Sequence, residues 1–446
     1  MRVGLLTLLL AGLAALAAGG AGATVATERT TRVASPPPEN GPAANGPSDH
    51  ITFSGDERKT RWVAFDSEAS NLVRGDTNGV RDIFVIRRGS RLGRLHGEVV
   101  RVSMATGRNG AQANGPSQRP SLGGDVRRAP RCVAFESRAA NLASADTSPD
   151  WDVYVRIGNR TRLASPGLTD AQNAAVDGRC RTVTFEAGRF VWVRDLVRNR
   201  TLRIARGSDP DQQTNGKGVV YVRGNQVYHR RFERVRGQLR RRGRELLVSR
   251  NRRGRPGNGA SRNPVADDNG HYVAFDSAAT NLCVRACRGV SRDRNGRTRD
   301  VFRRTISRRA PTRDYMQMAS YSHPVRAQGN GDSHSPGMSG AGEIIVFVSE
   351  GTNLRESRGI RRVDPNGRIA DVFFWNFPRG RGYGAVSRES RTNGSRGSGQ
   401  PWPAPVRNPA ISNKANYLGW TSDARAAGAT SPPGIEDVFI RFMGGR

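Results

Sequence analysis

Residues 61–87 read RWVAFDSEASNLVRGDTNGVRDIFVIR, and degraded copies of this stretch recur along the rest of the chain. WVAFDS and DIFVIR alternate apolar and polar residues, which predicts two strands, and NLVRGDTNG between them is rich in turn-forming residues. A two-stranded ribbon cannot bury its own apolar face. A repeat of this size therefore predicts units that stack on one another, as in a propeller or a solenoid.

Two strand patterns each occur seven times. An aromatic stands at the fourth position of residues 62–67, 132–137, 182–187, 218–223, 272–277, 344–349 and 417–422. A second pattern, with the aromatic third, begins at residues 82, 152, 190, 226, 300, 371 and 437. We take these as the second and third strands of seven blades, with weakly marked first strands ahead of them.

A fourth strand ending at residues 103, 165, 205, 249, 320 and 387 completes only six of the units. The segment TRVAS at residues 31–35 nearly duplicates TRLAS at residues 161–165, so we expect it to complete the last unit and remove two open sheet edges. The pattern predicts an all-β, seven-bladed β-propeller of four-stranded antiparallel blades, one domain over residues 24–446. A solenoid is the alternative.

The N-terminus predicts export. Arg2 precedes the apolar run VGLLTLLLAGLAALAA, which ends in small residues at 21–23, so residues 1–23 fit a signal peptide, with a retained anchor as the alternative. No other segment has the length of a membrane span, so none is expected after cleavage. The four cysteines suit an oxidising compartment, and their positions predict the pairs Cys132–Cys180 and Cys283–Cys287. We expect a periplasmic, cell-wall or extracellular protein.

The charge is strongly positive, with 72 Lys and Arg against 39 Asp and Glu and a net charge of +33. Such a surface adheres to polyanions, and export favours anionic envelope polymers over nucleic acid, for which we expect no specific binding. Scattered arginines that only solvate the surface are the alternative. Residues 229–253, HRRFERVRGQLRRRGRELLVSRNRR, concentrate arginine in one predicted hairpin, as an anion-binding patch or a solvated one.

The phrase VAFDSEASNLVRGDTNGVRDIFV, echoed by VAFESRAANLASADTSPDWDVYV and VAFDSAATNL, resembles the WD-repeat-like β-propeller repeats of the TolB type. The resemblance extends over nearly the whole mature chain, although residues 182–206 and 218–249 lack the NL…D.NG segment. It implies a periplasmic propeller that acts in an envelope complex. The separate α/β domain that precedes the propeller in TolB has no counterpart in this sequence.

Loops between second and third strands share one face with the links between blades, and both sets are long, so this face is the default binding surface. Its acidic loops carry Asp and Asn at spacings that resemble part of a calcium loop, although turn capping by the same side chains is the favoured interpretation. The residues are Asp76, Asn78 and Asp82; Asp146 and Asp152; Asp293, Asn295 and Asp300; and Asp364, Asn366 and Asp371. We expect no other cofactor.

Catalytic signatures are few. The chain has no GxSxG motif. His323, Asp332 and His334 form a candidate metal or acid–base site, with solvated loop residues as the alternative. We therefore expect a monomeric, non-catalytic scaffold that binds envelope proteins or anionic cell-wall polymers. The alternative is a propeller hydrolase or lyase acting on a polysaccharide or peptide, which a convergent acidic or His cluster in the central funnel would favour.

Overall fold

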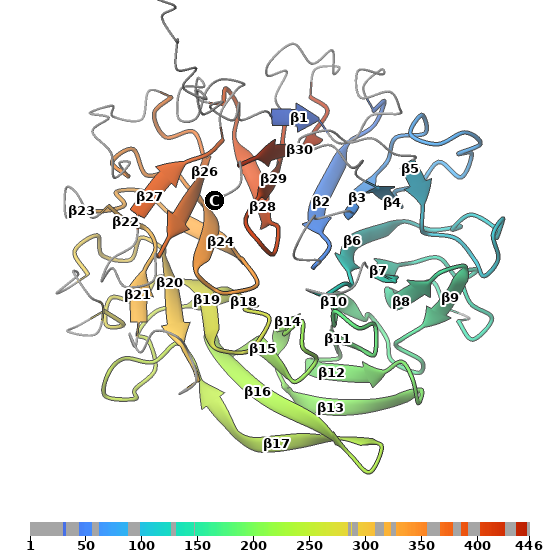
Figure 1. Cartoon of the computed structure of the whole chain (residues 1–446), viewed down its shortest axis with the longest axis horizontal. Coiled ribbons are helices and arrows are strands. Elements are labelled where there is room, and N and C mark those ends of the chain that lie inside the picture. The colour runs from blue at the N-terminus through green and yellow to red at the C-terminus, as the bar shows by residue number, and fades with distance from the viewer. Residues whose placement is uncertain are drawn as a thin grey trace, which may run out of the picture.

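The computed structural model shows seven four-stranded antiparallel sheets arranged in a ring (Figure 1). It describes residues 30–32, 44–55, 62–87, 99–125, 131–146, 148–283, 287, 293–307, 316–322, 327–354, 366–377, 385–390, 402–423 and 434–443. The predicted signal peptide, residues 1–23, lies outside the described residues. In the part of the chain described, no helix is both long and apolar enough to cross a membrane.

The seven blades follow one another along the chain. Blades 1 to 3 are β2 (Ser48–Phe53), β3 (Trp62–Ser67), β4 (Asp82–Arg87), β5 (Val99–Arg101); β6 (Ser117–Leu122), β7 (Cys132–Ser137), β8 (Asp152–Ile157), β9 (Arg160–Leu163); and β10 (Gln172–Val176), β11 (Thr182–Ala187), β12 (Phe190–Asp195), β13 (Arg200–Arg206). Blades 4 and 5 are β14 (Ser208–Gln212), β15 (Gly218–Arg223), β16 (Gln226–Val235), β17 (Gln238–Leu247); and β18 (Ser261–Ala266), β19 (Tyr272–Ser277), β20 (Asp300–Thr305), β21 (Met316–Met318). Blades 6 and 7 are β24 (Ser333–Met338), β25 (Ile344–Ser349), β26 (Asp371–Asn376), β27 (Ala385–Arg388); and β28 (Val406–Ile411), β29 (Tyr417–Ser422), β30 (Asp437–Phe442), β1 (Thr30–Arg32). A small ladder of β22 (Tyr321–Ser322) and β23 (Ala327–Gln328) links blades 5 and 6.

The last blade is completed by a strand from the N-terminal part of the chain, which confirms the predicted closure. β1 pairs antiparallel with β30, with Thr30 opposite Arg441 and Arg32 opposite Phe439. Figure 1 shows β1 beside β30, next to the first blade. The pairing residues are 30–32, whereas the sequence predicted 31–35, and residues 33–35 lie outside the described part. The covered edge of β30 is no longer a template for pairing with another chain.

Apolar faces of neighbouring blades pack against each other because second and third strands present large side chains on both faces of each sheet. Ile51 and Val63 of blade 1 share a buried cluster with Tyr417 and Val438 of blade 7. The recurrent aromatics stack within their blades, as Phe65 does on Phe84 at 5.9 Å between ring centroids. Strands buried on both faces read as nearly continuous apolar runs, which explains VAFD and IFVI.

Each innermost strand contains a bulge that contributes to the contacts between neighbouring blades. One residue per blade has a left-handed φ of 48–54°, at the point where the pairing with the second strand shifts register: His50, Arg119, Asn173, Asp209, Asn263, Ser335 and Asn408. Carboxylates of the preceding blade accept the N–H of such residues. Arg119 N donates to Asp66 Oδ2 at 2.9 Å, and Asn263 N donates to Asp209 Oδ2 at 3.1 Å. Charge-assisted bonds of this kind stabilise a fold by about 1.5–3 kcal/mol each.

Both predicted disulfides are present. Cys132 in β7 is bonded to Cys180, which lies in the turn after β10, so this bridge ties blade 2 to blade 3. Cys283 is bonded to Cys287 in the loop that follows β19. The described residues contain no free cysteine. Such bonding is typical of proteins that fold in an oxidising compartment.

Candidate anion-binding cleft

The arginine-rich segment forms the longest hairpin of the ring. β16 and β17 are ten residues each, whereas the third strands of the other six blades have six residues. Figure 1 shows the pair extending past its blade toward β12 and β13 of blade 3. The hairpin lies on the face of the first-to-second and third-to-fourth connections, opposite the face that carries the acidic loops.

Two contacts fix the hairpin against blade 3. Phe232, 1% exposed, packs in a cluster with Val191, Val193 and Tyr221. Arg234 Nη2 lies 2.7 Å from Asp195 Oδ2, whose side chain is 2% exposed. The buried ring of Phe232 and the ion pair between Arg234 and Asp195 hold the hairpin in one position against blade 3. The hairpin therefore forms a fixed wall of the adjacent cavity.

A cavity of about 1050 Å³ lies between this wall and the inner turns of blades 3 to 5. We call it the cationic cleft. Its lining contains seven cations and two carboxylates: Arg179, Arg181, Lys217, Arg231, Arg234, Arg242 and Arg244 against Asp177 and Glu233. A concave surface with this excess of cations over carboxylates concentrates positive electrostatic potential.

Three of the exposed cations, on the hairpin and the turn before β15, form no ion pair with the described part of the chain. Lys217, Arg231 and Arg244 are exposed and form no ion pair with any residue that the structure describes. Arg242, by contrast, lies 2.8 Å from Glu233 Oε2. Unneutralised guanidinium and ammonium groups facing a common cavity are the donors that phosphate and carboxylate ligands need.

The inner end of the cleft approaches the ring axis. A smaller cavity of about 370 Å³ shares Arg179, Asn215, Lys217 and Asn269 with the cleft, and it also touches Asp125 of blade 2 and Asp268 of blade 5. The two cavities together form a path from the hairpin toward the centre, which suits an extended chain better than a compact ion.

One histidine in the cleft is held neutral. Burial, followed by the charge of Arg231, lowers the pKa of His229 to about 4. Its Nε2 lies 3.0 Å from Gln213 Nε2, so the amide donates and the ring nitrogen accepts. His229 therefore adds no positive charge to the cleft near neutral pH.

The acidic loops lie on the other face, and most of their carboxylates have partners. Asp82, Asp152, Asp300 and Asp371 each accept a hydrogen bond from a serine that follows the fourth strand of the same blade: Ser103, Ser165, Ser320 and Ser390. The interpretation of the last Asp as a structural anchor holds for these four residues. Asp146 accepts bonds from Tyr154 Oη and Ser148 N.

Arginine already contacts two of the three predicted calcium loops. Arg101 Nη1 lies 2.9 Å from Asp76 Oδ1 and 3.3 Å from Asp82 Oδ2, and Asn78 also donates to Asp82. In blade 6, Arg388 Nη1 lies 3.5 Å from Asp371 Oδ2 and 3.3 Å from Asn366 Oδ1. Asp364 lies outside the described residues. In the third loop, with Asp293, Asn295 and Asp300, no arginine within the described part of the chain forms such an ion pair.

The predicted His323, Asp332 and His334 site is only partly visible, because His323 lies outside the described residues. Asp332 Oδ2 accepts a bond from Arg299 Nε at 3.1 Å. His334 Nδ1 lies 3.0 Å from Ser335 Oγ, and burial lowers its pKa, with Arg299 lowering it further. In the described residues, no group of three or more His, Cys, Asp or Glu side chains is placed to hold a metal.

Carboxylates do converge at the centre of the ring, a feature that the sequence analysis did not find. Asp49, Asp66, Glu136, Glu186, Asp209 and Asp276 lie on or beside the innermost strands, and bulge N–H groups bind most of them. His50 Nδ1 lies 2.8 Å from Asp66 Oδ2. The acidic fifth residue of WVAFDS, CVAFES and TVTFEA was the available signal. A convergent acidic cluster is the feature that would favour the hydrolase or lyase alternative. Five of these carboxylates accept a bulge N–H from the next blade, so they serve the contacts between blades.

No protein-family model and no curated protein sequence matches the chain. Among solved structures, it is similar to the β-propeller domain of the Trilobed protease from Pyrococcus furiosus, with 6% identity, a TM-score of 0.44, and 89% of this chain and 96% of that chain covered. It is also similar to an oligogalacturonate lyase in complex with manganese, with 8% identity, a TM-score of 0.45 and coverages of 89% and 90%. TolB from Acinetobacter baumannii matches with 9% identity, a TM-score of 0.34 and coverages of 90% and 81%. A putative TolB from Agrobacterium tumefaciens is also among the similar structures. The seven four-stranded sheets of this chain themselves form a seven-bladed β-propeller.

Proposed function

We propose that this protein is an exported, non-catalytic propeller that binds a linear anionic polymer of the cell envelope in the cationic cleft. The single observation that carries the proposal is the presence of Lys217, Arg231 and Arg244 in one cavity without counter-ions among the described residues. A charge of +33 alone would favour weak adhesion over the whole surface. A cavity with fixed walls that is lined by three of these cations would instead provide one defined binding site.

The shape of the site favours a chain over a single ion. The cleft and the cavity beside it share four lining residues and run from the hairpin toward the ring axis. Several charged groups along one polymer can bind such a path together, which increases affinity without requiring a deep pocket. Export rests on the predicted signal peptide and is supported by the two disulfides.

Binding of inorganic polyphosphate and of polygalacturonate, measured by calorimetry on the mature chain, tests the proposal with a phosphate and a carboxylate polymer. Replacing Lys217, Arg231 and Arg244 together by Gln should weaken binding at least about tenfold, because three unneutralised cations are removed. The matched control replaces the exposed Arg160, Arg252 and Arg253, which lie outside the cleft lining, and should bind as the unaltered chain does.

The melting temperature separates a folding defect from a lost site. All three cleft residues are exposed, so both triple variants should melt with the unaltered protein. Equal loss of affinity in the two variants would show that net charge rather than the cleft accounts for binding. Equal affinity of the cleft variant and the unaltered chain would also exclude the proposed site.

A further inference from the structure

The loop between the second and third strands of blade 5 has the acidic pattern of blade 1, but among the described residues no arginine pairs with its carboxylates as Arg101 does in blade 1. In blade 1, the Nη1 atom of Arg101 lies among three oxygens, 2.9 Å from Asp76 Oδ1, 3.3 Å from Asp82 Oδ2 and 2.9 Å from Gln112 Oε1. Arg101 is 8% exposed, so a buried positive charge neutralises the two carboxylates.

The strand register identifies the residue that takes the place of this arginine in blade 5. Arg101 is paired with Phe84, two residues after Asp82, and Arg388 is paired in the same way with Phe373 in blade 6. The residue paired with Phe302 in blade 5 is Met318. A thioether carries no charge, and the Sδ atom contacts Gln328 Nε2 at 3.5 Å.

The oxygens around this position keep the arrangement of blade 1. Asp293 and Asn295 correspond to Asp76 and Asn78, because each Asn donates to the backbone of the following link, at Gly329 O and Ala113 O. Gln328 corresponds to Gln112: its Oε1 accepts the N–H of Arg294 at 2.6 Å, as Gln112 accepts that of Thr77. The link in blade 5 thus supplies the same oxygen donors.

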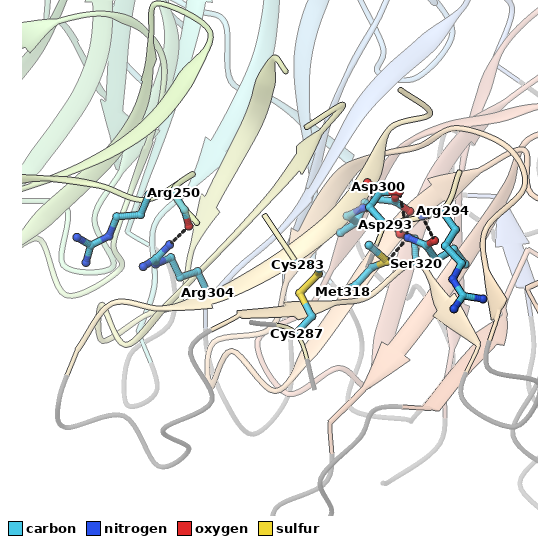
Figure 2. The surroundings of a disulfide bond; sticks show 11 residues. Arg250, Cys283, Cys287, Asp293, Arg294, Asp300, Arg304, Met318 and Ser320 are labelled. Atoms are coloured by element: carbon cyan, nitrogen blue, oxygen red, sulfur yellow. Dashed lines mark hydrogen bonds between the residues drawn. A yellow bond between two sulfur atoms is a disulfide. The ribbon is translucent and has the colours of Figure 1, made fainter. Parts of the chain in front are cut away.

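Two buried oxygens of this acidic loop have no hydrogen-bond donor among the described residues. Asp300 is 1% exposed, and its Oδ2 has no hydrogen-bond partner, nor does Asn295 Oδ1. Figure 2 shows Asp293, Asp300, Ser320 and Met318 gathered together, with the guanidinium of Arg294 turned away from them.

We propose that blade 5 binds one calcium ion through Asp293, Asp300 and the amide oxygen of Asn295, with Gln328 and water completing the shell. The site has two carboxylates rather than three acidic or His ligands, and calcium accepts amide oxygens and water readily. A buried carboxylate oxygen without a donor supplies the place that a cation would fill. Blades 1 and 6 are outside the proposal because an arginine already lies there.

Calorimetric titration of the chelator-treated, full-length mature protein with calcium tests the site. We expect one ion per chain, with a Kd on the order of 10⁻⁴ M as in extracellular modules, and a melting temperature raised by calcium more than by magnesium. Met318→Arg, which restores the residue of blades 1 and 6, should abolish calcium binding and raise the melting temperature of the calcium-free protein. Met318→Leu is the matched control and should keep binding.

A second variant keeps the test decisive if Met318→Arg does not fold. Asp300→Asn removes the charge at the unsatisfied oxygen and should weaken calcium binding at least about tenfold. Absence of calcium binding to the unaltered chain would overturn the proposal. Undiminished binding in a folded Met318→Arg or in Asp300→Asn would place the ion elsewhere and overturn it as well.

Discussion

At the residue scale, the ring depends on left-handed residues at its centre. Asn, Asp, Ser, His and Arg occupy the seven bulges, and Asn and Asp tolerate this conformation better than most other residues. Five of the seven bulges turn a backbone N–H toward a carboxylate of the preceding blade, so one residue there fixes both the path of its strand and a contact between blades. Asp209 has both roles, because its own N–H donates to Glu186 and its carboxylate accepts from Asn263.

Asp209→Asn should stabilise the protein near neutral pH. Burial, followed by Glu186 and Asp276, raises the pKa of Asp209 from 3.8 to about 6, so the folded state keeps a proton that the unfolded state has lost. Stability from this group is therefore present below pH of about 4 and decreases as pH rises to about 6. The gain of the variant over the unaltered chain should grow across that window and then stay constant, as measured by urea unfolding at several pH values. A difference that does not depend on pH would contradict the assignment.

How much of each strand could be predicted from the sequence depended on how strong its residue pattern is. All seven second strands have their predicted bounds, because a fixed aromatic and two-sided burial leave a strong pattern. The first strand of blade 4 has a weaker pattern, since SDPDQ contains no apolar residue, and its position depends on the hydrogen bond from Asn263 N to Asp209. The sequence contains Met318 where blades 1 and 6 have an arginine. Only the strand register shows that these three positions are equivalent.

At the element scale, the β16–β17 hairpin makes the seven blades unequal, because its two strands have ten residues each. The sequence placed arginines on this hairpin, but the cavity arises because the hairpin is anchored over blade 3. Phe232 and Arg234 supply the anchors, and neither contact is local in sequence. The cleft could therefore not be predicted from composition or periodicity.

Phe232→Ala should lower the free energy of unfolding by about 3 kcal/mol, because it removes a buried aromatic and leaves a cavity beside Val191 and Tyr221. It should also weaken polymer binding, since the wall of the cleft loses its anchor. Val235→Ala, at a site 37% exposed in the same strand, is the control and should change neither quantity. Denaturant unfolding measures the first effect, and an unchanged midpoint in Phe232→Ala would show that the hairpin is not anchored by this side chain.

At the scale of the whole molecule, closure of the ring makes the fold one cooperative unit. β1 covers the edge of β30, and the Cys132–Cys180 bond joins two further blades. The resemblance of TRVAS to TRLAS predicted the closing strand at residues 31–35, and the described pairing covers residues 30–32.

Deletion of residues 30–35 should lower the melting temperature by several degrees, because it removes the β1 ladder and exposes the edge of β30. Deletion of residues 24–29 alone is the matched control and should leave the melting temperature unchanged. The deletion of 30–35 should also increase association between chains, visible in light scattering. Identical melting curves for the two deletions would contradict closure by β1.

The central claim is that a polyanion binds in one cleft of a strongly basic protein, and arginine-specific modification by phenylglyoxal tests it most directly. Modification with and without polyphosphate, followed by mass spectrometry, reports which of the many arginines the polymer covers. The account predicts protection of Arg181, Arg231 and Arg244, which line the cleft, and none at Arg160, Arg252 or Arg253. Uniform protection over the surface, or protection centred on another face, would contradict the account.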